Sequence, residues 1–155
     1  MRRSDKEIID RGAIGDILKR ARICHLSLCD GNKPYVVPLN YGYEGGSLYM
    51  HSAREGRKID IIRRNNLADF AVYVDERLVT GDASCRFTMK YRSAMGEGKV
   101  MLVEGGSEKE KALRIIMRQQ AGDGEYHFER ASLDKTVILR LDIDQLSGKR
   151  SGYLD

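Results

Sequence analysis

The chain has 155 residues and a mass of 17.6 kDa, enough for one domain whose core needs neither a disulfide nor a metal. Hydrophobic residues make up 41% and charged residues 32%, and no apolar run approaches the ~18 residues of a membrane-spanning helix. The net charge of +4 is a mild excess, so its distribution matters more than its total. We expect a single domain over residues 1–155, and a cytoplasmic location because the first residues contain no apolar signal-peptide segment.

The first periodic segment covers residues 14–21, where the apolar side chains are spaced as on one face of a helix. Asp10 precedes this segment and is a suitable N-cap. From Cys24 to Cys29 the period changes to two, and the turn residues 30–33 follow. A second strand is expected from Tyr35 to Tyr43 and a third over residues 48–51, which together predict a meander of three antiparallel strands.

A short helix containing Ile59 and Ile62 follows the loop 53–56, and a fourth strand is expected over residues 68–74. Residues 75–84 are polar and predict a long hairpin connection. The next strand region, residues 86–104, contains Gly96 and Gly98, which indicate a bulge or bend. Ser107 and Glu110 have the spacing of a capping box for a helix over residues 108–119. Leu113, Ile116 and Met117 are expected on the inner side of that helix.

A last strand, residues 136–143, completes a mainly β fold: a barrel of about six antiparallel strands with short helices. Hairpins rather than crossover helices join the strands, which excludes a doubly wound sheet. The cysteines Cys24, Cys29 and Cys85 are odd in number and match no zinc spacing, so we expect reduced, small apolar residues and no metal.

Basic residues gather between Arg54 and Arg64, and such a cluster is typical of a solvated helix face, a nucleic-acid patch or a phosphate pocket. A strand ends here, Gly56 permits a tight turn, and a helix begins with Arg57 and Lys58. Helix N-termini attract anions through their free N–H groups and the macrodipole. Together with the Ser52 hydroxyl, these groups are suited to bind a phosphate monoester. The alternative interpretation is that Arg57 and Lys58 only solvate the start of the helix.

The second strand contains Pro38, which cannot donate to a ladder and favours an edge or a bulge. Such a strand exposes backbone groups that can hydrogen-bond a flat heteroaromatic ring, and Asn40 adds an amide. A core strand with an edge proline is the alternative.

Segments 34–41 and 48–58 resemble the FMN-binding core of the Nim-type (5-nitroimidazole antibiotic resistance) branch of the pyridoxamine 5'-phosphate oxidase-like split-barrel superfamily. Segment 90–98 resembles a later strand of the same proteins, and the three segments follow in the same order. The resemblance implies an FMN-binding split barrel with FMN at a homodimer interface. It also implies that the isoalloxazine contacts residues 36–41, that His51 and Ser52 lie beside the ring and the ribityl phosphate, and that Arg57 and Lys58 hold the phosphate. The complete set of implied cofactor-binding residues is Val36, Val37, Pro38, Leu39, Asn40, Tyr41, Met50, His51, Ser52, Arg57, Lys58, Arg92 and Ser93.

The resemblance predicts a flavin-dependent reductase of small acceptors such as nitro-aromatics, with His51 as the catalytic candidate and a nicotinamide donor that docks transiently. No G-x-G-x-x-G segment follows a strand, so a dedicated nicotinamide domain is not expected. The alternatives are a non-enzymatic FMN-binding or storage module, and a haem-binding split barrel with His25, His51 or His127 as axial ligand. Nucleic-acid binding is not expected, because the basic cluster has no helix-turn-helix or stacking-aromatic pattern.

Overall fold

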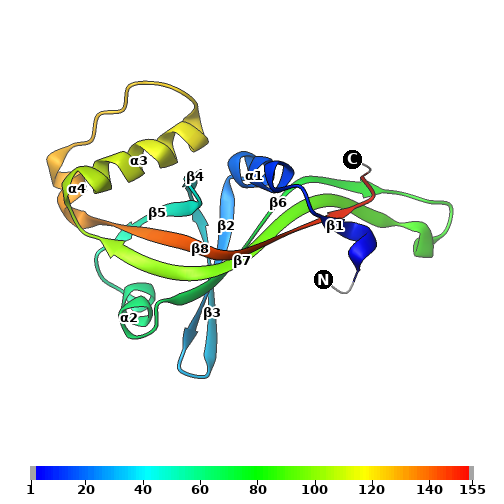
Figure 1. The fold of residues 1–155 in the computed structure, drawn as a ribbon, viewed down its shortest axis with the longest axis horizontal. Coiled ribbons are helices and arrows are strands. Elements are labelled where there is room, and N and C mark those ends of the chain that lie inside the picture. Colours follow the sequence, from blue (N-terminus) through cyan, green and yellow to red (C-terminus); the bar gives the residue numbers. More distant parts are fainter. Residues whose placement is uncertain (1–2, 154–155) are drawn as a thin grey trace.

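The computed structural model describes residues 3–153; the ends of the expected domain, residues 1–2 and 154–155, lie outside the described part. Its centre is an eight-stranded antiparallel sheet with the order β3-β2-β6-β7-β8-β5-β4, and β1 pairs with β8 (Figure 1). The strands are β1 Glu7–Ile8, β2 Ile23–Asp30, β3 Lys33–Asn40, β4 Gly42–Glu44, β5 Ser47–Ala53, β6 Leu67–Val79, β7 Thr88–Val103 and β8 Thr136–Ser151. The predicted mainly β class is therefore confirmed.

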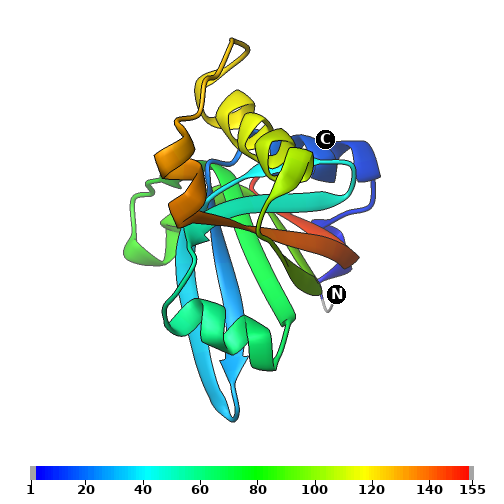
Figure 2. The ribbon, with the colours of Figure 1, turned by 90° about the vertical axis from the view of Figure 1, so that its left-hand side faces the viewer.

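The helices that pack against the sheet are α1 Arg11–Arg20, α2 Arg57–Arg64, α3 Gly106–Ala121 and α4 Arg130–Lys135. Helix α3 packs on β4 and β5, and α2 lies beside β2 on the opposite side of the molecule (Figure 2). Gly42 permits the close approach of α3, because a Cβ there would lie 2.7 Å from the backbone of Ile115. Single-turn 3-10 helices occupy Ser4–Lys6 and Ser84–Arg86.

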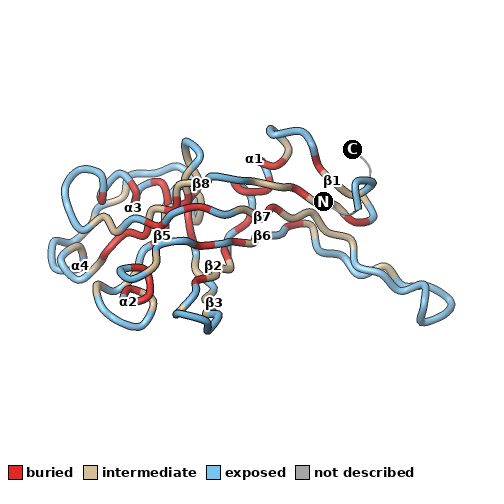
Figure 3. Tube along the Cα trace, turned by 60° about the horizontal axis from the view of Figure 1, so that its bottom comes forward, coloured by how far each residue is buried: buried red, intermediate tan, exposed pale blue. Residues whose placement is uncertain are grey.

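The core lies between the curled sheet and the helices α1 and α2, and exposed residues cover the hairpin tips and the connection between α3 and α4 (Figure 3). The alternation predicted for the first strand is confirmed, since Cys24, Leu26 and Leu28 point inward. Buried residues of the other elements include Ile14, Ile17, Leu18, Ile59, Ile61, Ile62, Phe70, Val72, Leu139 and Leu141.

The predicted meander is wrong at its second strand. The expected strand 35–43 is divided at Tyr41 into β3 and β4, and these pair with different neighbours, β2 and β5. Tyr41 is fully buried, and its hydroxyl donates a hydrogen bond of 2.6 Å to the carbonyl of Leu18. Turning this side chain into the core interrupts the strand. Because no ladder among residues 3–153 joins β3 to β5, the barrel is open at this point.

The helix predictions are confirmed at α1 and partly wrong at α3. Asp10 caps α1 by accepting from the N–H groups of Gly12 and Ala13. Helix α3 begins before the predicted capping box: its N-cap is Gly105, without a side-chain cap.

The inner side of α3 carries Ile116, as expected, but also Lys109 and Ile115. Leu113 and Met117, which were expected there, are only partly buried.

The second half of the sheet is longer than predicted. Strand β6 continues to Val79 through Asp75, a non-glycine residue with φ of 61°, and the register shifts between Val74 and Arg77. The bulge predicted near Gly98 is confirmed by a register shift at Glu97/Gly98. Strand β8 runs to Ser151 rather than 143, and α4 was not predicted, because polar residues there hide the strand and helix periods.

Candidate functional site

Strand β3 presents a free backbone edge, because among residues 3–153 it is an end strand of the sheet and pairs only with β2. On an antiparallel strand, alternate residues direct their N–H and C=O groups to opposite edges. The two prolines of the chain, Pro34 and Pro38, both lie on β3 with the same parity. Proline is tolerated where its nitrogen faces the free edge. The same parity directs the backbone groups of Val36 and Asn40 to that edge, where a ligand can use them.

The side chains of the 36–41 segment divide between two faces. Val36, Pro38 and Asn40 are exposed, whereas Val37 and Leu39 pack against the core. The side chain of Tyr41 lies within the core. This segment therefore offers a ligand one set of outward side chains and the backbone edge of β3.

Strand β5 ends at the same opening. Its ladder with β4 covers Ser47–Tyr49, so beyond Tyr49 its edge toward β3 has no strand partner in the described part of the chain. Met50 is fully buried, His51 is exposed, and Ser52 is partly buried. No hydrogen bond of His51 to another side chain is found within residues 3–153, so its imidazole is available to a ligand.

Helix α2 begins four residues after β5 ends, and its first residue, Arg57, lies over the ring of Tyr35 on β3. Its N-cap, Gly56, has φ of 117°, a left-handed value that favours glycine, and no side chain caps the helix. The uncapped N–H groups and the macrodipole therefore remain available to an anion.

The two cations of this turn differ in their surroundings. The Arg57 guanidinium lies 3.6 Å from the Asp30 carboxylate and 4.9 Å from the centre of the Tyr35 ring. Arg64 also contacts Asp30, at 2.9 Å. Lys58 is partly buried, forms no ion pair within residues 3–153, and has a pKa that burial lowers. An anion beside Lys58 would offset the cost of burying its charge.

Arg92 and Ser93 are not brought to this opening within one chain. The register connects His51 to Ile138 of β8 and Ile138 to Val103 of β7. Arg92 lies near the other end of β7, up to roughly 36 Å along the strand from Val103. Its guanidinium contacts Asp75 at 2.8 Å and stacks 4.2 Å from the ring centre of Tyr153.

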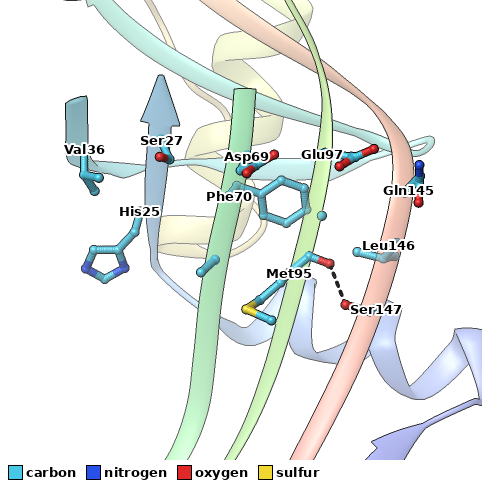
Figure 4. Close-up of a pocket in the computed structure, with 12 residues that line it drawn as sticks. His25, Ser27, Val36, Asp69, Phe70, Met95, Glu97, Gln145, Leu146 and Ser147 are labelled. Carbon is cyan, nitrogen blue, oxygen red and sulfur yellow. Dashed lines mark hydrogen bonds between the residues drawn. The ribbon is translucent and has the colours of Figure 1, made fainter. Parts of the chain in front are cut away.

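A cavity of about 520 Å³ lies on the outer face of β2, β6, β7 and β8, and sequence reasoning missed it (Figure 4). Of the predicted FMN-binding residues only Val36 lines it, and the haem-ligand candidate His25 lines it as well. The other lining residues are Ser27, Asp69, Phe70, Ala71, Met95, Gly96, Glu97, Gln145, Leu146 and Ser147. Asp69 and Glu97 face each other across the β6–β7 ladder. The alternation of residues along each strand predicts which side chains point outward. The cavity also depends on which strands are neighbours, and this order was not predicted from the sequence.

The three cysteines differ in their exposure. Cys24 is buried, but Cys29 and Cys85 are exposed, and all three are free thiols. Residues 3–153 contain no group of three His, Cys, Asp or Glu side chains that could hold a metal ion. In the same part of the chain no helix is long and apolar enough to cross a membrane.

Comparison with known proteins shows the family. The sequence profile of the family described as pyridoxamine 5'-phosphate oxidase matches residues 10–150. A crystal structure from Bacteroides thetaiotaomicron VPI-5482, of a protein provisionally assigned to 5-nitroimidazole antibiotic resistance, is 35% identical. It covers 93% of this chain and 86% of its own, with a TM-score of 0.82. The chain belongs to the pyridoxamine 5'-phosphate oxidase family, as the sequence resemblance predicted.

Two further structures share the fold at 21% identity and a TM-score of 0.84. The flavocytochrome Anf3 from Azotobacter vinelandii covers 100% of this chain and 74% of its own. The FAD and heme binding protein from Mycobacterium smegmatis covers 96% and 74%. No curated protein matches the chain.

Proposed function

We propose that the protein binds FMN and acts as a flavin-dependent reductase of small acceptors such as nitro-aromatics. The observation that carries the proposal is the meeting of three features at the open side of the barrel. These are the free edge of β3, the unpaired end of β5, and the uncapped first turn of α2 with its two cations. The backbone donors and acceptors of β3 and β5 can hydrogen-bond a flat ring, and the positive charge at the start of α2 can bind the phosphate monoester that the ring carries.

The phosphate is assigned to the first turn of α2. Lys58 is a partly buried cation without an ion-pair partner in residues 3–153, and Arg57 is held nearby by Asp30 and Tyr35. Ser52, at the end of β5, adds a hydroxyl donor. The residues present therefore fit a phosphate group in charge and in hydrogen-bonding capacity.

The ring is assigned to the edge of β3, where the backbone groups of Val36 and Asn40 and the carbonyl of Pro38 are available. Tyr41 and Met50 contribute through their backbone alone, since their side chains lie in the core. When bound, FMN supplies the electron transfer, and the protein supplies its position and its electrostatic environment. His51 is the candidate to place a proton at the acceptor, because its exposed imidazole has no competing side-chain partner within residues 3–153.

We further propose a homodimer in which the outer face of the sheet is covered by a second copy. Tyr73 and Met95 on this face are 48% and 46% exposed, and Val36, 58% exposed, continues the apolar surface to β3. Exposed apolar patches of this kind mark interaction sites. A second copy also accounts for Arg92 and Ser93, which reach a flavin only if they come from the partner.

Binding and turnover test the proposal separately. Titration with FMN should give tighter binding than titration with riboflavin, and the FMN complex should have the mass of a dimer by light scattering. Steady-state reduction of a nitro-aromatic by a nicotinamide donor, with turnover, supports the reductase. FMN binding without turnover with any donor and acceptor pair supports the non-enzymatic FMN-binding alternative. Equal affinity for the two flavins, or a monomeric complex, contradicts the site.

Haem is the second candidate, because His25 lines the 520 Å³ cavity and is stacked on Tyr73 with ring centres 5.8 Å apart. A neighbour of the same fold is described as FAD- and haem-binding. A Soret band on adding hemin that disappears in His25→Ala favours haem as a ligand, and no such band excludes it.

A further inference from the structure

Lys109 is a buried cation that is not among the residues assigned to FMN. It lies on α3, and the residue is only 5% exposed. Its ammonium group donates to three backbone carbonyls: Glu104 at 3.3 Å, Thr136 at 2.6 Å, and Leu133. Three donors therefore meet three acceptors, which satisfies the full hydrogen-bonding capacity of the ammonium.

The three carbonyls belong to separate elements. Glu104 follows the last residue of β7, Leu133 lies on α4, and Thr136 is the first residue of β8. Without the ammonium, these inward-facing carbonyls would lose a charged donor. Lys109 therefore joins the start of α3, α4 and the entry to β8 at one point.

This point is connected to the proposed phosphate segment by two contacts. Thr136 pairs with Ala53, the last residue of β5. Arg54, the next residue, contacts the Glu104 carboxylate at 2.7 Å and donates to its carbonyl at 3.5 Å, the same carbonyl that Lys109 uses. Ala53 and Arg54 therefore each contact a residue whose carbonyl accepts from Lys109: Thr136 for Ala53 and Glu104 for Arg54.

We propose that Lys109 is a positioning residue for the phosphate-binding segment 53–58, acting through Thr136 and Glu104. The inference rests on the proposed FMN site. The segment between Ala53 and helix α2 contains Gly56 in a left-handed conformation and has no strand partner within residues 3–153. Its direction therefore depends on where β5 ends and where Arg54 is held. If the anchor is released, the first turn of α2 loses its fixed position relative to β3.

The test is Lys109→Met, which keeps the length of the side chain and removes the ammonium. We expect the Kd for FMN to rise about tenfold, equivalent to one charge-assisted hydrogen bond, and the Kd for riboflavin to change less than about threefold. Lys111→Met, on the exposed side of the same helix, should leave both constants unchanged. Ile116→Val removes core packing on α3 without touching a carbonyl, so it controls for general loss of stability.

A readout without flavin separates this inference from the proposed function. Amide hydrogen exchange of residues 53–58 should be faster in Lys109→Met than in the wild type and in Ile116→Val. Unchanged exchange, or equal losses of FMN and riboflavin binding, overturns the positioning role even if the wild type prefers FMN. A wild type without FMN preference contradicts the phosphate site, and the exchange measurement still decides on Lys109.

If Lys109→Met does not fold, Arg54→Met replaces it, because this exposed side chain carries only the second of the two contacts. Faster exchange of residues 55–58 and a smaller loss of FMN selectivity support the inference. If the exchange of residues 55–58 and the selectivity for FMN both equal those of the wild type, the positioning role is overturned.

Discussion

Replacing Arg57 and Lys58 together by alanine should remove most of the preference for FMN over riboflavin. A hydrogen bond to a charged group contributes about 1.5–3 kcal/mol. We assign most of this binding free energy to Lys58, because it is partly buried and has no ion-pair partner within residues 3–153. Arg57 receives less, because about half of its side chain is exposed and Asp30 competes for it. We expect a loss of about 2–4 kcal/mol in FMN binding, roughly a 30- to 1000-fold rise in Kd.

The assay is titration of each variant with FMN and with riboflavin at fixed ionic strength, followed by flavin fluorescence or calorimetry. Riboflavin has the same ring and ribityl chain without the phosphate, so its Kd should change less than about threefold. Arg63→Ala is the matched control, because it removes an exposed cation from the other end of α2. Equal losses for the two flavins would refute the phosphate assignment, and a larger effect from Arg57 alone than from Lys58 alone would refute the division between them.

Three further outcomes are expected. Tyr41→Phe loses the buried hydrogen bond to α1 and should lower the free energy of unfolding by about 1 kcal/mol in urea, with no change in FMN affinity; weakened FMN binding would show that Tyr41 contacts the ligand. A thiol reagent at pH 8 should modify two cysteines of the native protein and the third only after unfolding, because burial raises the pKa of Cys24 to about 12. Hydrogen bonds from Arg20 and then Arg92 lower the pKa of Asp75. The carboxylate therefore contributes to the free energy of unfolding above its unfolded pKa near 3.9, and this contribution is lost as the pH falls through the lower folded pKa. Asp75→Asn should therefore destabilise the protein at pH 7, and this difference should shrink at pH 3; a constant difference would contradict the assignment.

Local sequence signals predicted the elements whose period is regular. The helical spacing and the Asp10 cap define α1, and strict alternation defines β2. The end of β5, Gly56 and the first turn of α2 were also readable, because a strand end, a glycine and a helix start adjoin in the chain. These features depend on neighbouring residues alone.

The rest depends on tertiary structure. The break at Tyr41 arises because its side chain enters the core and its hydroxyl reaches α1, which an apolar run does not reveal. The outer cavity needs the order of the strands, and Asp69 opposite Glu97 needs their register. Lys109 is a charged residue within a helix, and the helical spacing of the apolar residues does not predict that it is buried. The sequence therefore does not show that backbone carbonyls from three elements surround its ammonium. Arg92 and Ser93 were grouped with the site by resemblance, but one chain keeps them at the other end of β7.

The most direct test of the FMN proposal is the absorption spectrum of the freshly purified protein, with mass analysis of whatever is released on denaturation. We expect a yellow protein that releases FMN, up to one per chain, or a colourless protein that takes up one FMN per chain when it is added. A colourless protein that does not bind added FMN, or one that releases a different cofactor, contradicts the proposed FMN site.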